Sequence, residues 1–334
     1  MKKPDVNRFL RNNGSILLVA AGCIVLWLLM GIFGNGIRLS SLINNIYTAS
    51  FLGIAGLAQM LVVTTGRGAI DLSIPGMITL GGYLGMMICN GENSRILPAL
   101  LVVIAAGVIV GFLNSLMVIY LKIPAIIATM AMNYIIVTVT MLVDHNFNVF
   151  TIPSVLKSFV TSRVAGIPII IFVVIALALF IGFMIRSTTY GKSLLSMGQN
   201  QEAARLAGVQ VVKTEMITYV TASVLAAIAG MLISARVNGA RLGMGNNYQM
   251  DSIACIVVGG TLMSGGRCNA IGTLIGSLFL YLIIAAMQLM GANAGIQSVV
   301  KGALIIVVLL LGATDATVKR PKKEKSGTAP AVTS

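Results

Sequence analysis

Long apolar stretches separated by short polar segments follow one another along almost the whole chain. A helix that crosses a bilayer needs about 20 mainly apolar residues. The apolar stretches are continuous and do not alternate with polar positions, so they predict helices and not the strands of a membrane barrel. Ten stretches qualify: Ser15–Phe33, Ile46–Thr65, Leu72–Cys89, Ile96–Tyr120, Ile123–Leu142, Ile167–Ile185, Met216–Ala235, Asp251–Ser264, Ala270–Met290 and Ser298–Ala313.

The third and eighth stretches are short, and glycines interrupt both. Asp71 opens the third and Asp251 opens the eighth, and a Gly-Gly pair follows within each. The fourth and ninth stretches both carry a Gly-x-x-x-Gly spacing. Each pair lies five stretches apart, and an odd offset would invert one half of the chain relative to the other. The pattern predicts an inverted internal repeat, with chance clustering of glycines as the alternative.

The composition excludes most soluble proteins. Hydrophobic residues make up 57% of the 334 residues and charged residues only 10%, whereas soluble domains have about 25% charged residues. With the N-terminus inside and ten crossings, sixteen Lys and Arg residues fall inside, six fall outside and Lys301 lies within the last stretch. This bias follows the positive-inside rule. The net charge of +14 therefore reflects membrane topology, and no nucleic-acid partner is expected.

The chain divides into one membrane domain and two short ends. Residues 1–14 form a cytoplasmic N-terminus, residues 15–313 form the all-helical membrane domain, and residues 314–334 form a basic cytoplasmic tail that we expect to be disordered and near anionic lipid. The first stretch predicts an uncleaved helix because it is longer than a typical signal-peptide core. The inner segment 186–215 predicts short helices punctuated by Gly191, Gly198 and Gly208.

The chain lacks the usual signatures of catalysis. Cys23, Cys89, Cys255 and Cys268 are far apart in sequence and His145 is the single histidine, so no metal site is predicted. No phosphate-binding GxxxxGK[ST] loop occurs, so we expect the chain to hold no cofactor and to hydrolyse no ATP itself. The sequence predicts a transport pathway whose energy comes from another protein.

One motif in the inner segment is specific. Residues 199–209 read QNQEAARLAGV, which resembles the E-A-A-x-x-x-G element of ABC-importer permeases, and in particular that of ribose-type sugar permeases. The resemblance extends from about residue 40 to 312. It includes Gly68–Ile74, Ile123–Met130, Tyr248–Ala254, Val258–Gly266, Ile271–Gly276 and Gln297–Gly302.

The resemblance implies partners and a location. These are a cytoplasmic ABC ATPase that uses ATP and Mg²⁺, a second permease subunit, identical or different, and an external solute-binding protein, assembled in the bacterial inner membrane with both termini cytoplasmic. The cargo it implies is a small polar solute, foremost a monosaccharide. The residues implied to couple the permease to the ATPase are Gln199, Gln201, Glu202, Ala203, Ala204, Arg205 and Gly208.

The broken segments that match the family are expected to line the pathway. The residues implied there are Asp71, Ser73, Asn133, Asp251 and Thr261. Departures from the sugar-permease pattern cluster nearby, and they are Pro75, Met250, Cys255 and Cys268-Asn269. Since related permeases carry nucleosides or branched-chain amino acids, those cargoes remain alternatives. An ion-coupled secondary transporter and a non-transporting scaffold are alternatives of another class.

Structural roles compete with these functional ones. Asp71 and Asp251 have the position of helix N-caps, which accept hydrogen bonds from free backbone N–H groups. Asn133 has the alternative of an interhelical hydrogen bond. Lys301 either reaches outward or pairs with an acid. Asp144-His145 is expected to be an ordinary solvated pair, and Glu202 and Arg205 have the spacing of an i,i+3 surface pair.

Overall fold

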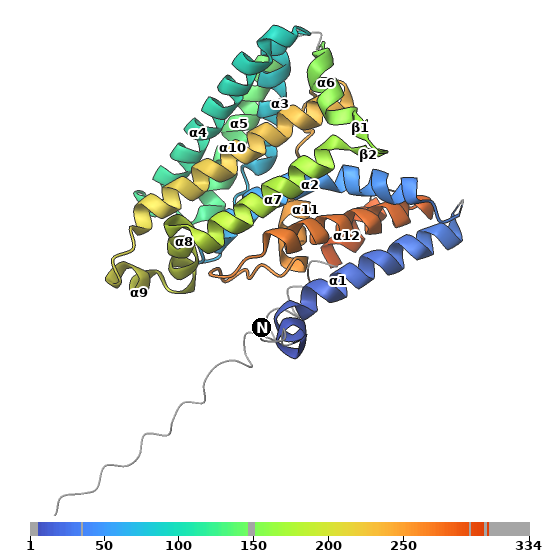
Figure 1. Cartoon of the computed structure of the whole chain (residues 1–334). Coiled ribbons are helices and arrows are strands. Elements are labelled where there is room, and N and C mark those ends of the chain that lie inside the picture. The colour runs from blue at the N-terminus through green and yellow to red at the C-terminus, as the bar shows by residue number, and fades with distance from the viewer. Residues whose placement is uncertain (1–5, 35, 146–150, 294, 304–305, 307–334) are drawn as a thin grey trace, which may run out of the picture.

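The computed structural model describes residues 6–34, 36–145, 151–293, 295–303 and 306, and nearly all of them are helical (Figure 1). Residues 295–303 and 306 add a further helical stretch after the last labelled helix. The elements are α1 (Val6–Phe33), α2 (Leu39–Thr64), α3 (Ile74–Cys89), η1 (Asn93–Arg95), α4 (Ile96–Ile119), α5 (Ala125–His145), α6 (Ser154–Thr161), β1 (Arg163–Val164), β2 (Ile167–Pro168), α7 (Ile169–Ser187), α8 (Thr189–Gln199), α9 (Gln201–Leu206), α10 (Val211–Val237), α11 (Tyr248–Val258) and α12 (Ala270–Leu289).

The prediction of an all-helical, multi-pass membrane protein is confirmed. Among the described residues, six helices are long and apolar enough to span a bilayer: α2, α4 with η1, α5, α7, α10 and α12. The apolar part of α1, together with α3 and α11, coincides with three further expected stretches but is shorter. The tenth stretch lies mostly outside the described residues, and the tail 314–334 lies wholly outside them, so the count of ten stays a prediction.

Burial separates a central helix from peripheral ones. In α2, 83% of the apolar window is buried, whereas α4 and α5 each bury 28% and α7 buries 33%. The exposed faces of these outer helices carry large apolar side chains such as Phe112, Tyr134 and Phe180. Exposing such faces to water would cost free energy, whereas contact with lipid or with a second subunit would not.

Helices from the two halves of the chain pack against each other. Helix α10, from the second half of the chain, packs most extensively against α3 and α4 of the first half. Helix α2, from the first half, packs most extensively against α12 and α10 of the second half, and then against α11. Two related halves that exchange one helix would produce this arrangement. The inverted repeat itself stays a prediction.

Glycines let these helices approach until their backbones touch. A Cβ atom at Gly230 would lie 1.9 Å from the carbonyl oxygen of Ile78, and one at Gly111 would lie 2.5 Å from the Cα atom of Val220. The expected packing role of the Gly-x-x-x-Gly spacings is therefore present. Gly272, however, meets Gly259 of the segment after α11, so the two spacings do not contact equivalent helices.

Three expectations about local structure were wrong. Helix α11 ends at Val258 rather than near Ser264, because the chain turns at Gly259 and then takes a left-handed conformation at Gly260, with φ of 84°. Helix α10 begins at Val211, five residues before the expected boundary. Gly191 and Gly198 lie inside α8 rather than between helices. They are close-approach sites, since a Cβ atom at Gly198 would lie 2.0 Å from the carbonyl oxygen of Thr64.

Candidate functional site

The chain runs back into the helical bundle between α2 and α3. Gln59 lies five residues before the end of α2, which is about 7.5 Å along the helix. Its side-chain amide, oriented to satisfy both groups, donates to the carbonyl oxygen of Asp71 and accepts from the N–H of Asp71, each at 3.1 Å. Asp71 therefore lies beside the body of α2, and its side chain is buried. In the second half of the chain, residues 238–247 connect α10 to α11.

Asp71 organises this returning segment, and it is not the N-cap of α3. One carboxylate oxygen, Oδ1, accepts from the backbone N–H and the hydroxyl of Ser73. Ser73 occupies the N-cap position and makes no side-chain cap hydrogen bond. Asn114 of α4 donates to the Ser73 hydroxyl at 2.8 Å. Two predicted pathway residues are thus joined directly, and Asn114, a buried asparagine that the sequence analysis missed, ties Ser73 to α4.

Side chains of α5 accept hydrogen bonds from backbone N–H groups at the start of α3. Thr129 accepts from the N–H of Leu72 at 2.9 Å, and Asn133 accepts from the N–H of Gly76 at 3.0 Å. Pro75, between them in sequence, has no N–H to satisfy. The interhelical hydrogen bond, one of the two alternatives for Asn133, is therefore present, while its place in the pathway stays a prediction.

Replacing Asn133 with leucine should lower stability by about 1–3 kcal/mol, because the N–H of Gly76 would lose its partner in an apolar setting. The measurement is the midpoint of thermal unfolding in detergent. Thr138→Val is the matched control, since Thr138 is on the same helix, is exposed, and bonds only to the Tyr134 carbonyl of its own helix. Equal midpoints for the two variants would contradict this role of Asn133.

Helix α11, which corresponds to the eighth expected stretch, carries an ion pair. Asp251 lies in the first turn of α11, after the N-cap position at Asn247, so its expected role as a cap was wrong. Lys301 Nζ donates to Asp251 Oδ2 at 3.0 Å, and the two side chains are only 22% and 12% exposed. Of the alternatives for Lys301, pairing with an acid is the one observed. The pair ties the helical stretch after α12 to α11.

Thr261 shares no hydrogen bond with the other predicted pathway residues in the described part of the chain. It follows α11 in the segment 259–269 and is buried, and within the described residues its hydroxyl has no hydrogen-bond partner. Hydrogen bonds join Asp71 to Ser73, and Asn133 to the start of α3. That the five residues line one pathway stays a prediction.

The inner segment forms two short helices, α8 and α9, as expected, and the predicted coupling residues run from the last residue of α8 through α9 to Gly208. Asn200, between α8 and α9, accepts from the N–H of Ala203 at 3.0 Å and so caps α9. Gly208 follows α9 with a left-handed φ of 83° and open space around it. The segment thus turns away from α9 where glycine is favoured.

Burial divides the predicted coupling residues. Ala203, Glu202 and Arg205 are exposed, whereas Ala204 is buried against the body of the protein and is unavailable to a partner. No ion pair joins Glu202 to Arg205 among the described residues. Leu206, which the sequence analysis did not select, is 86% exposed. A leucine beside small residues, in a segment expected to face the cytoplasm, was the signal in the sequence that could have pointed to a docking surface.

Helix α8 is anchored to two connecting segments, residues 65–73 before α3 and residues 259–269 after α11. Gly66, Gly198, Gly265 and Gly266 form what we call the glycine junction, in which the backbones of the two segments and of α8 meet. A Cβ atom at Gly265 would lie 2.3 Å from the Cα of Gly66, and one at Gly198 would lie 2.3 Å from the N of Gly266. The N–H of Gly266 also donates to the carbonyl of Thr64, at 3.0 Å. Movement of α8 would therefore reach both segments.

A tyrosine fixes α8 against α10. The Tyr190 and Thr218 hydroxyls lie 2.8 Å apart in a hydrogen bond. Burial raises the pKa of Tyr190 to about 12, so its hydroxyl stays protonated at any physiological pH. This contact makes α8, α9 and the start of α10 one connected unit.

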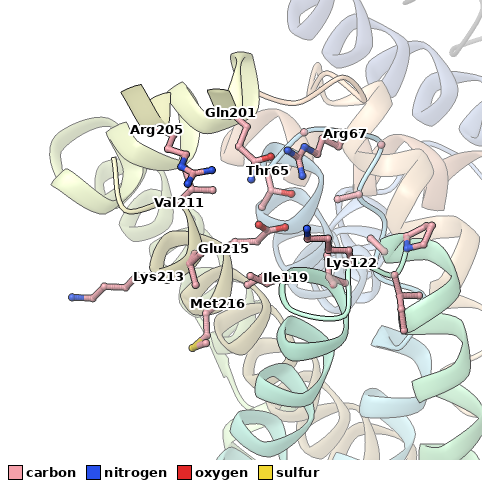
Figure 2. Close-up of a pocket in the computed structure, with 18 of the residues that line it drawn as sticks. Thr65, Arg67, Ile119, Lys122, Gln201, Arg205, Val211, Lys213, Glu215 and Met216 are labelled. Atoms are coloured by element: carbon pink, nitrogen blue, oxygen red, sulfur yellow. The ribbon is translucent and has the colours of Figure 1, made fainter. Parts of the chain in front are cut away.

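A cleft of about 950 Å³ lies beside α9 (Figure 2). It is lined by residues from four segments, 65–69, 118–126, 201–205 and 209–216. Figure 2 shows the Glu215 carboxylate in the middle of the cleft, between Thr65 and the amine of Lys122, while Lys213 points away. Glu215 is a functional candidate that the sequence analysis placed in the loop before α10.

The outer and inner segments lie at opposite ends of the molecule. Helices α8 and α9 are at one end, and α6 with the β1–β2 hairpin is at the other (Figure 1). This agrees with the expected ten crossings, in which the residues between the fifth and sixth stretches lie outside the membrane and segment 186–215 lies inside. At the outer end, Asp144 is more than a solvated residue, since the Tyr83 hydroxyl donates to it at 2.7 Å. The side chain of His145 lies outside the described residues.

Comparison with known proteins identifies relatives over most of the chain. Residues 41–309 match the family described as the permease component of branched-chain amino acid transport systems. The ribose import permease protein RbsC of Escherichia coli is 30% identical over 281 residues, covering 83% of this chain and 87% of that protein. The probable ABC transporter permease protein YphD of the same organism is 28% identical over 309 residues, covering 92% and 91%.

A further relative comes from another bacterium. The galactose/methyl galactoside import permease protein MglC of Haemophilus influenzae is 30% identical over 287 residues, covering 78% of this chain and 81% of that protein. No solved structure matches the chain.

Proposed function

Because this chain belongs to the permease-component family of branched-chain amino acid transport systems, we propose that it is the membrane-spanning subunit of an ATP-driven importer of a monosaccharide. The observation that carries the proposal is the similarity, over most of both chains, to permeases named for ribose and galactose import. The family description names branched-chain amino acids, so those solutes are the second candidate.

The proposal includes three kinds of partner. A cytoplasmic ATPase would bind the exposed face of α9, made by Glu202, Ala203 and Leu206. A second permease subunit would cover exposed apolar helices such as α5, and an external solute-binding protein would deliver the solute at the end that carries α6. The complex would lie in the bacterial inner membrane with both termini cytoplasmic. The permease would hold no ATP, Mg²⁺ or other cofactor itself.

The contacts of α8 support a route for coupling. A partner that shifts α9 would shift α8, since only Asn200 separates the two helices. At the glycine junction the movement would reach segment 65–73, which ends at Asp71 and Ser73, and segment 259–269, which contains Thr261. Segments 65–73 and 259–269 would then move together. This would open the pathway at one side as it closes at the other.

Transport by the reconstituted complex tests the proposal. The permease, its ATPase and its binding protein are placed in liposomes, and uptake of labelled ribose, galactose and leucine is followed with and without ATP. We expect ATP-dependent uptake of a monosaccharide and no ATP hydrolysis by the permease alone. Uptake driven by an ion gradient without ATP would overturn the importer assignment, and uptake of leucine alone would overturn the sugar assignment.

A further inference from the structure

The cleft beside α9 contains two side chains whose oxygens can accept hydrogen bonds from a ligand. The side-chain oxygen of Gln201, Oε1, is buried and has no hydrogen-bond partner within the described residues. Leaving such a buried acceptor unpaired costs free energy. Glu215 is only 9% exposed, and its carboxylate takes part in no ion pair in the described part of the chain. Their position around one cavity indicates a ligand that donates hydrogen bonds.

The same cleft contains cationic donors. Arg67, Lys122 and Arg205 line it and come from three different segments. Arg67 and Lys122 both have a left-handed backbone, with φ of 58° and 55°. Non-glycine residues seldom adopt this conformation, and where they do it is often at a functional site. The charge of Arg67 acts on Glu215, so donors and acceptors share one space.

This mixture of groups selects among ligand classes. A carboxylate ligand would only accept hydrogen bonds, so it would leave Gln201 unpaired. Carboxylate and phosphate ligands alike would be repelled by Glu215. A cationic ligand would be repelled by Arg67, Lys122 and Arg205. Hydroxyl groups both donate and accept, so a neutral polyhydroxylated molecule satisfies both sets. The volume of about 950 Å³ lies within the usual range for small-molecule sites, about 300–1,000 Å³.

We infer that this cleft binds the transported solute on the cytoplasmic side, as a neutral polyhydroxylated molecule such as a monosaccharide, before its release. The inference rests on the proposed function. Its place in the fold supports it, because Gln201 belongs to the coupling helix α9 and Arg67 to the segment that ends at Asp71. A solute held between them joins the two moving parts. Its departure then accompanies their separation.

Direct binding tests this inference. The full-length permease in lipid nanodiscs is examined by saturation-transfer NMR with ribose, galactose and inorganic phosphate as separate probes. We expect a signal for a sugar and at least a tenfold loss of affinity in Glu215→Ala and in Gln201→Leu. Lys192→Gln is the matched control, since it removes an exposed cation of α8 outside the cleft, and it should leave binding unchanged.

A second measurement does not depend on one variant folding well. In a cysteine-free background, Val118→Cys places a thiol in the cleft lining, and sugar should slow its reaction with a small polar thiol reagent at least threefold. Three results would each overturn the inference. They are sugar binding that is unchanged in both cleft variants, labelling of Val118→Cys that sugar does not slow, and labelling that phosphate slows more than sugar does. If these occur while the reconstituted complex still imports a sugar, only the cleft site fails. If no ATP-driven uptake occurs, the proposed function fails.

Discussion

Replacing Leu206 with aspartate, or Ala203 with tryptophan, is expected to abolish solute-stimulated ATP hydrolysis by the assembled transporter. Leu206 is 86% exposed, and Ala203 is exposed and small on the same short helix. A charge would disfavour burial of Leu206 in a partner groove, and an indole would block close approach at Ala203. The loss of a central anchor costs about 2 kcal/mol or more, which is roughly 30-fold in affinity.

The measurement is ATP turnover of the purified complex with saturating binding protein and solute, together with co-purification of the ATPase. Leu206→Met is the matched control, because it keeps an exposed apolar side chain of similar size at the same position. It should keep full stimulation. If both α9 variants inserted normally and kept full stimulation, α9 would not be the coupling element.

The turn after α9 extends this prediction. Gly208 has a left-handed φ, and no atom lies near the position that a Cβ would take, so strain and not collision would oppose other residues. Gly208→Val should therefore cost at least about 1 kcal/mol and impair coupling. Gly208→Asn should be much milder, because asparagine tolerates this conformation. The same ATP turnover assay compares the two, and equal losses would argue against the backbone explanation.

Removing the charge of Lys301 is expected to destabilise the permease strongly. Lys301→Met leaves the Asp251 carboxylate buried without its partner, and breaking a buried pair in this way costs about 3–5 kcal/mol. The double variant Asp251→Leu with Lys301→Met removes both charges and should recover most of the loss. Thermal unfolding in detergent and the yield of folded protein measure the effect.

An exposed ion pair in the same chain provides the control. Glu92 and Arg95 lie 2.8 Å apart, but each side chain is 50% exposed. Arg95→Met should change stability by about 0.5 kcal/mol or less, since solvent screens such pairs. A double variant at Asp251 and Lys301 that is as unstable as Lys301→Met would show that packing at these positions, and not the unpaired charge, dominates.

The sequence by itself determined the membrane class and most of the helices, and it placed a short helix at the predicted coupling element. Lipid offers no hydrogen bonds, so each spanning segment must satisfy its own backbone, and long apolar stretches are enough to specify helices. Short-range chemistry was predictable in part, since Gly208 ends α9 as expected whereas neither Asp71 nor Asp251 is an N-cap. Asn200 caps α9 and Gly208 ends it, because both effects depend on residues within a few positions of each other.

Only the tertiary structure decided which groups meet. An apolar side chain is as stable in lipid as against another helix, so apolar stretches do not specify helix partners, and small residues and polar groups far apart in sequence decide them. The packing of α10 against α3 depends on glycine contacts such as Gly230 with Ile78. Asn133 meets Gly76 across 57 residues, and Lys301 meets Asp251 across 50.

The same limit explains the coupling surface and the cleft. Ala203 and Ala204 are chemically identical neighbours, and only the packing of α9 against the body exposes one and buries the other. Glu215 was taken for a loop residue because a single acid at the start of an apolar stretch is typical of its polar boundary. The folded chain places it in a cleft with Arg67 and Lys122, because charges from distant segments converge only when the helices that carry them pack together.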